Sequence, residues 1–232
     1  MPLVLLPGLL CDSTVWRQQA IGLSDIAVTV VPDLSGLDSV HDMARAALTL
    51  LPARFSLAGH SMGGYVALEI MRQAPERVTR LALISTQPRR DTAEQAERRR
   101  GLIWKAERQE FDAVLDDLIP LFFHQDRLSD RALVDEMVEM AERVGPQAFL
   151  RQQKAIVSRP DSVETLTAIT CPVLVACGRQ DAIAPLENSE HMAAQIKGAE
   201  LNVFESCGHM APMECASLTN VVMRRWLSEA EA

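Results

Sequence analysis

The sequence lacks several features that mark special classes of protein. It has no excess of positive charge: the formal net charge is -8 at pH 7, which argues against a surface for nucleic acid or an anionic membrane. Its five cysteines form no CxxC pair, and their odd number does not suggest a disulfide framework. The apolar residues 1–10 carry no basic segment and are too short for a signal peptide or a membrane span. We therefore expect a cytoplasmic protein with neither a membrane nor a nucleic-acid partner.

Motifs for cofactors are missing as well. No group of residues has the spacing of a metal site, and neither a G-x-G-x-x-G sequence nor a P-loop occurs. We expect no metal and no cofactor, and a small molecule as the partner. The sequence leaves the oligomeric state open.

Short apolar runs alternate with helical patterns along most of the chain. Continuous apolar runs such as "LVLL" at 3–6 and "AVTVV" at 27–31 are typical of parallel strands that are covered on both faces. Further strands are expected at 55–59, 78–85, 171–178 and 199–205. The pattern predicts an α/β protein with a mainly parallel sheet of about six strands flanked by helices.

The alternation stops between residues 87 and 166, where only helical periodicities occur. Strand signals return directly afterwards, so we interpret 87–166 as a helical cap inserted into a core made of 1–86 and 167–232. Within this segment, "RRR" at 98–100 lies among glutamates and is expected to form a solvated helix face.

The most informative stretch is "GHSMG" at 59–63, which matches G-x-S-x-G at a predicted strand-to-helix junction. The turn at such a junction is so tight that side chains at Gly59 and Gly63 would collide with the neighbouring backbone. Ser61 is therefore expected to project above the carboxyl edge of the sheet as a nucleophile, near the start of a helix at Met62.

A serine nucleophile needs a base and an acid that orients the base. Asp181 in "GRQDAIAP" and His209 in "CGHMAPME" follow later strands, so their loops meet at the same edge of the sheet. Alone, Asp181 could simply cap a helix and His209 could be a surface residue, but together with Ser61 they predict a triad. We expect His60 to pack behind Ser61, and we keep His124 as an alternative histidine.

These three motifs resemble those of the α/β-hydrolase family, and the resemblance covers nearly the whole chain. In that family "LLPGLLCDSTVW" at 5–16 corresponds to the oxyanion loop, although Pro7 stands where a histidine is usual. The resemblance implies that the backbone N–H groups of Leu9 and Met62 hold the oxyanion. Leu10 is the alternative to Leu9.

A serine at this position argues against dehalogenases, which use aspartate, and against cysteine hydrolases. The resemblance then implies a serine hydrolase that cleaves a carboxylic ester through an acyl-enzyme (an EC 3.1.1-like activity). Enol-lactonases, thioesterases and C–C bond hydrolases use the same triad, and some proteins of this fold only bind ligands. The triad alone does not separate these activities.

The predicted cap offers candidates for the substrate pocket. Phe122, Phe123 and Phe149 are apolar side chains that could lie above Ser61, although residues at helical spacing more often form a cap's own core. Arg151 and Arg159 are weaker candidates for binding a substrate carboxylate, because surface arginines are usually solvated.

Overall fold

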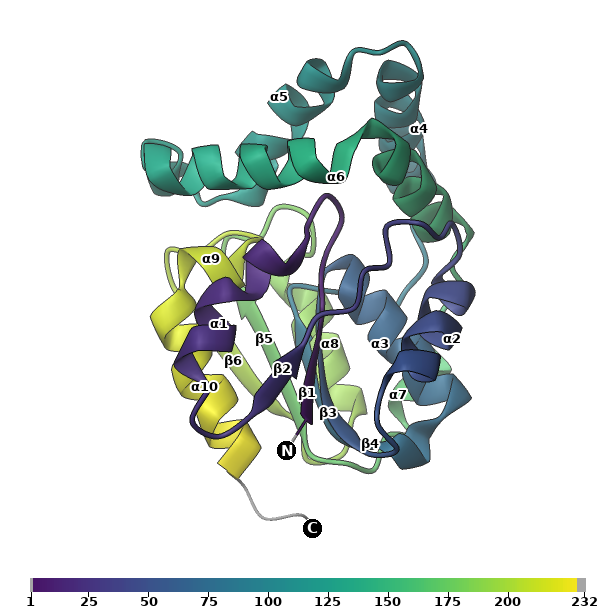
Figure 1. Cartoon of the computed structure of the whole chain (residues 1–232), viewed down its shortest axis with the longest axis vertical. Helices are drawn as coiled ribbons and strands as arrows, with labels where there is room; N and C mark the ends of the chain where they lie inside the picture. Colours follow the sequence, from purple (N-terminus) through teal and green to yellow (C-terminus); the bar gives the residue numbers. More distant parts are fainter. Residues whose placement is uncertain (1, 229–232) are drawn as a thin grey trace.

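The computed structural model describes residues 2–228, and its centre is one sheet of six parallel strands (Figure 1). The strand order is β2-β1-β3-β4-β5-β6. The strands are β1 (Pro2–Leu6), β2 (Val28–Val30), β3 (Phe55–His60), β4 (Val78–Ile84), β5 (Val173–Gly178) and β6 (Glu200–Phe204). All six lie where the sequence predicts strands.

Burial explains why the central strands are apolar along their whole length. Every residue of β3, β4 and β5 is buried, because helices cover both faces of a parallel sheet. The edge strand β2 differs, since Val28 keeps 72% of its surface exposed. The register pairs Leu6 of β1 with Gly59 of β3, which brings the ends of both strands to the same level.

Helices and short 3-10 turns surround the sheet. Figure 1 shows α1 and α10 together at one side of the sheet and α2 and α3 together at the other. The α-helices of these layers are α1 (Arg17–Gly22), α2 (Val40–Leu50), α3 (Met62–Gln73), α7 (Val163–Leu166), α8 (Leu186–Gln195), α9 (Ala211–Glu214) and α10 (Ala216–Ser228). The 3-10 turns are η1 (Ser13–Trp16), η2 (Pro75–Arg77) and η3 (Gln125–Arg127).

Three longer helices separate β4 from α7 and contact one another: α4 (Ala93–Glu107), α5 (Phe111–Phe122) and α6 (Arg131–Ser158). They lie beyond the end of the sheet toward which the strands run (Figure 1). Helix α6 is kinked at Gly145, where φ is 76°. The next residue is Pro146, which has no N–H group to donate a helical hydrogen bond. The division into a core of 1–86 and 167–232 and a cap of 87–166 stays a prediction.

Within residues 2–228, no helix is both long enough and apolar enough to cross a membrane. The same part of the chain holds no group of three or more His, Cys, Asp or Glu side chains arranged to bind a metal ion.

Candidate active site

Ser61 occupies the turn between β3 and α3 in a backbone conformation that is rare for a residue with a side chain. Its φ is 53° and its ψ is -117°, a type of strain that costs about 1–3 kcal/mol and persists only where the surroundings enforce it. The Ser61 N–H donates to the Ile84 carbonyl at 3.0 Å, and Thr86 Oγ1 donates to the Ser61 carbonyl at 2.8 Å. These bonds hold the turn in place.

Two glycines make this turn sterically possible. A Cβ atom added at Gly59 would collide with the backbone of Gly63, and one added at Gly63 would collide with the Leu6 carbonyl. Since backbone cannot yield as a flexible side chain can, the spacing G-x-S-x-G follows directly from the geometry of the turn.

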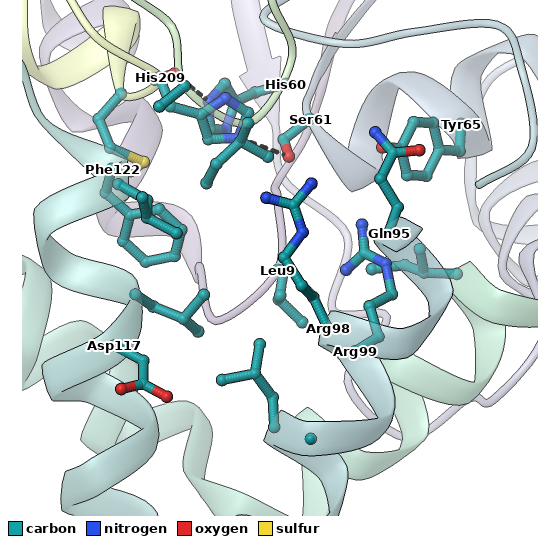
Figure 2. Close-up of a pocket in the computed structure, with 18 of the residues that line it drawn as sticks. Leu9, His60, Ser61, Tyr65, Gln95, Arg98, Arg99, Asp117, Phe122 and His209 are labelled. Atoms are coloured by element: carbon teal, nitrogen blue, oxygen red, sulfur yellow. Dashed lines mark hydrogen bonds between the residues drawn. The ribbon is translucent and has the colours of Figure 1, made fainter. Parts of the chain in front are cut away.

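The three residues of the predicted triad lie in hydrogen-bonding contact. His209 Nε2 is 2.8 Å from Ser61 Oγ, and His209 Nδ1 is 2.9 Å from both carboxylate oxygens of Asp181. A carboxylate only accepts hydrogen bonds, so Nδ1 carries the proton and Nε2 presents its lone pair to the serine hydroxyl. Figure 2 shows Ser61 and His209 facing each other across the upper wall of a cavity.

Asp181 is buried yet held in its charged form. Burial by itself would raise the pKa of this carboxyl, but the charge and hydrogen bond of His209 outweigh burial and lower the pKa below its usual value. The backbone N–H groups of Ile183 and Ala184 also donate to Oδ1, at 2.9 and 2.8 Å. The loop after β5 therefore delivers an ionised acid to His209.

The loop that carries His209 is tied to the end of α5. The N–H groups of His209 and Met210 both donate to the Phe122 carbonyl, at 2.9 and 3.0 Å. The buried carboxylate of Glu214 accepts from the N–H groups of Gly208 and Met210, at 3.0 and 3.2 Å, and from that of His124 at 2.7 Å. Burial raises the pKa of Glu214 even though these donors favour the charged form.

The other two histidines near the site have different surroundings. His60 lies behind Ser61, where its Nε2–H donates to the His209 carbonyl at 3.0 Å and its ring packs edge-on against Trp16. Burial, together with the charge of His209, lowers the pKa of His60 to about 3. His124 Nδ1 accepts from the Asp126 N–H at 3.2 Å, and its side chain does not line the cavity. The histidine that contacts Ser61 Oγ is therefore His209.

The loop after β1 distinguishes the two candidate oxyanion donors. The Leu10 N–H, in a residue with φ of 60°, donates to Gln152 Oε1 of α6 at 3.0 Å. By contrast, neither the Leu9 nor the Met62 N–H has an acceptor among residues 2–228. Leu9 also borders the cavity that contains Ser61. This arrangement favours Leu9 over Leu10 as the partner of Met62.

The cavity beside Ser61 has a volume of about 280 Å³ and extends between the sheet edge and the helices α4, α5 and α6. Its lining is mainly apolar, with several polar side chains from α4. Ligand pockets in proteins typically measure about 300–1,000 Å³, so this volume suits a compact substrate. The lining residues include Leu9, His60, Ser61, Tyr65, Leu102, Leu118, Leu121, Phe122, Ile156, Ile183, His209 and Met210.

The three phenylalanines proposed for the pocket have different positions. Phe122 lines the cavity, with its ring stacked 6.2 Å from that of His209. Phe123 and Phe149 are buried elsewhere and do not line it; Phe149 packs edge-on against Phe111 at 6.0 Å. Those two side chains belong to the packing of the helices, so of the three only Phe122 remains a candidate substrate contact.

The arginines are also distributed differently from the expectation. Arg151 donates to the Ser35 carbonyl, and buried Arg159 pairs with Asp91 at 2.8 Å, so neither reaches the cavity. The expected solvated face at 98–100 is found for Arg98 and Arg100, which are exposed, whereas Arg99 is half-buried. Arg98 and Arg99 also border the cavity, which the expectation did not include. A helix presents consecutive residues in different directions, and a run of like charges conceals this difference.

Comparison with known proteins decides the family. The sequence profile of the alpha/beta hydrolase family matches residues 3–219. The chain belongs to that family. It is 28% identical over 228 residues to a pimeloyl-[acyl-carrier protein] methyl ester esterase of Nitrosomonas europaea, across 89% of this chain and 88% of that protein. A 2-hydroxymuconate semialdehyde hydrolase of Pseudomonas putida is 30% identical over 187 residues, across 76% of this chain and 63% of that protein.

A solved structure agrees with this assignment to the family. The thermophilic esterase from Thermogutta terrifontis superposes with a TM-score of 0.91 at 29% sequence identity, across 98% of this chain and 89% of that one. The expected α/β-hydrolase fold with a six-stranded parallel sheet is thereby confirmed. Of the three proteins named above, two are esterases and one is a semialdehyde hydrolase, so these similarities indicate a hydrolase and leave the substrate open.

Proposed function

We propose that this chain is a serine hydrolase of carboxylic esters in which Ser61 is the nucleophile, His209 the general base and Asp181 the orienting acid. One observation carries the proposal: Ser61 Oγ lies 2.8 Å from His209 Nε2 at the wall of a cavity, while Asp181 binds the other nitrogen of the same ring. The similarity to two esterases, at 28% and 29% identity, supports an ester as the substrate.

The proposed reaction proceeds in two halves. Ser61 Oγ attacks the acyl carbon as its proton passes to His209 Nε2, and the carbonyl electrons move onto oxygen. The N–H groups of Leu9 and Met62 hold that oxyanion. When the C–O bond to the leaving group breaks, His209 returns the proton to the departing alcohol.

Water then completes the cycle. It attacks the acyl-enzyme and gives a proton to His209, the bond between Ser61 and the acyl group breaks, and Ser61 recovers the proton. Asp181 holds Nδ1–H throughout and offsets the positive charge that His209 carries in each half. The products are one alcohol and one carboxylic acid.

The helices of residues 87–166 act in this proposal as a cap that shapes the substrate pocket. Phe122 contributes both a cavity wall and the carbonyl that orders the His209 loop. Gln152 holds Leu10 and so orients the neighbouring Leu9 N–H. Substitutions in the cap are therefore expected to change substrate choice more than the acylation chemistry.

A fluorophosphonate probe combined with p-nitrophenyl acetate turnover tests the proposal. The wild type should be labelled stoichiometrically and hydrolyse the ester, whereas Ser61→Ala should lose labelling and roughly a million-fold in kcat. Ser189→Ala, which changes a buried serine outside the cavity, is the matched control and should retain both signals. Neither labelling nor turnover in the wild type would instead favour a protein that only binds ligands.

A substrate panel separates the reactions that share this triad. It should contain short esters, acyl thioesters, lactones and vinylogous diketones. The similarity to a semialdehyde hydrolase makes C–C bond cleavage the second candidate. Turnover of the diketones without turnover of the esters would replace ester hydrolysis by that reaction.

A further inference from the structure

Helix α4 presents a row of polar side chains to the cavity that the ester chemistry itself does not use. Gln95, Arg98, Arg99 and Lys105 all border the same cavity as Ser61 and His209. Their spacing along the helix places them on one face. In Figure 2 the two arginine side chains extend from α4 toward the part of the cavity where Ser61 and Tyr65 lie.

Three of these four side chains are already bound to other protein groups. Gln95 Oε1 accepts from the N–H at the start of α4, at 2.9 Å. Arg99 donates to Asp91 at 2.6 Å and to Gln153 at 3.0 Å. Lys105 forms an ion pair with Asp117, another residue of the cavity wall. Asp117 therefore balances the charge of Lys105, whereas Arg99 shares the single carboxylate of Asp91 with Arg159.

Arg98 differs from its neighbours. It forms no hydrogen bond or ion pair within residues 2–228, although it borders the cavity. Arg100, two positions further, faces away from the cavity and pairs with Glu97 of its own helix. Arginine remains protonated at every physiological pH and offers five N–H donors in a planar fork. Arg98 is exposed to solvent at the border of the cavity, and it brings there a positive charge and a fork that no protein group uses.

We propose that Arg98 binds a carboxylate of the substrate, so that the preferred ester is a half-ester of a short dicarboxylic acid. This inference rests on the proposed function. A single guanidinium fork matches the two oxygens of one carboxylate. The apolar side chains Leu102, Leu118 and Leu121 line the cavity and suit the methylene segment between the two ends of such a substrate.

A pair of matched esters tests this assignment. Monomethyl glutarate carries the carboxylate, and methyl 5-oxohexanoate replaces it with a methyl ketone of similar size. The wild type should show a higher kcat/KM for monomethyl glutarate. Arg98→Gln should lower the ratio of the two kcat/KM values by about tenfold, the effect of losing one charge-assisted hydrogen-bonding partner that is partly screened by solvent.

Two further measurements sharpen the test. Arg100→Gln makes the same chemical change two positions away and should leave the ratio at its wild-type value. Arg98→Lys keeps the charge without the fork and should give an intermediate ratio. The preference of the wild type for the charged ester should also shrink as salt is added. An equal ratio in the wild type and Arg98→Gln overturns the inference.

Binding separates this inference from the proposed function. If the wild type hydrolysed neither of these esters nor p-nitrophenyl acetate, ester hydrolysis itself would be refuted, and calorimetric titration with glutarate would still test Arg98. The inference expects glutarate to bind the wild type and Arg100→Gln equally, and Arg98→Gln about tenfold more weakly. Equal glutarate affinity in all three proteins refutes the carboxylate site.

Discussion

Lowering the pH from 7 to 5 should remove about 2 kcal/mol of folding stability through one side chain, His60. This residue is 1% exposed, and its Nδ1 atom has no hydrogen-bond partner within residues 2–228. Its Nε2–H already donates to the His209 carbonyl. A second proton on the ring would therefore be buried without an acceptor and close to the ring of His209, 5.2 Å away.

The magnitude follows from the difference between the two states. The unfolded chain binds a proton at His60 with the ordinary pKa of 6.5, whereas burial and the charge of His209 lower the pKa in the folded protein to about 3. The folded state is thus favoured above the ordinary pKa, and this advantage is lost as the pH falls below it. At pH 5 the unfolded state gains roughly 2 kcal/mol from this proton, and at pH 7 only about 0.2 kcal/mol.

Urea unfolding at the two pH values measures this effect. His60→Gln keeps a donor for the His209 carbonyl and removes the titration, so the variant should lose about 2 kcal/mol less than the wild type between pH 7 and pH 5. Any stability lost at both pH values alike cancels in this comparison. The same pH-dependent loss in both proteins would refute the argument that His60 is kept neutral by its surroundings.

Three further predictions concern the groups around the triad. Asp181→Asn should leave the circular dichroism spectrum unchanged and lower kcat by about three to four orders of magnitude, because the wrong tautomer of His209 would face Ser61. A kcat near that of the wild type would mean that another carboxylate orients the histidine. Phe149→Ala should lower the unfolding free energy by about 3–5 kcal/mol without changing the preferred ester length. Phe122→Ala should change the preferred ester length. The reverse result would make Phe149 the substrate contact and Phe122 a packing residue. Burial raises the pKa of Glu214, so the unfolding free energy of the wild type, measured relative to Glu214→Gln, should fall as the pH rises above the ordinary pKa of 4.5. A difference between the two proteins that does not change with pH would contradict this.

The sequence was most informative where local geometry dictates the residue. Gly59 is required by a clash with the backbone of Gly63 inside the turn, so this part of the motif could be interpreted without the fold, whereas Gly63 is required by the Leu6 carbonyl of the neighbouring strand β1. Asp181 and His209 follow predicted strands, and the rule that parallel strands end at one sheet edge was enough to bring them near Ser61. These positions depend on chain order and on the direction of the strands.

Contacts between distant segments could not be predicted in this way. Gln152 and Leu10 are 142 positions apart, and Glu214 and His124 are 90 apart, yet both pairs order the site. Glu214 had no signal beyond being an acid near a predicted histidine loop.

The direction of a cap side chain was equally inaccessible. Helical periodicity shows which residues share a face, but it does not show which face borders the cavity. This is why the sequence does not separate Phe122 from Phe149, or Arg98 from Arg100: both arginines are exposed, but of these two only Arg98 borders the cavity.

The central claim is that Ser61 forms a covalent acyl-enzyme, and rapid-quench mass spectrometry tests it most directly. The wild type is mixed with excess p-nitrophenyl butyrate, quenched in acid within milliseconds and digested, with Ser61→Ala treated in parallel. We expect a butyryl group on the peptide that contains Ser61, formed at the rate of the p-nitrophenol burst and missing from Ser61→Ala. A butyryl group on a different residue, or burst and turnover that persist in Ser61→Ala, would contradict it.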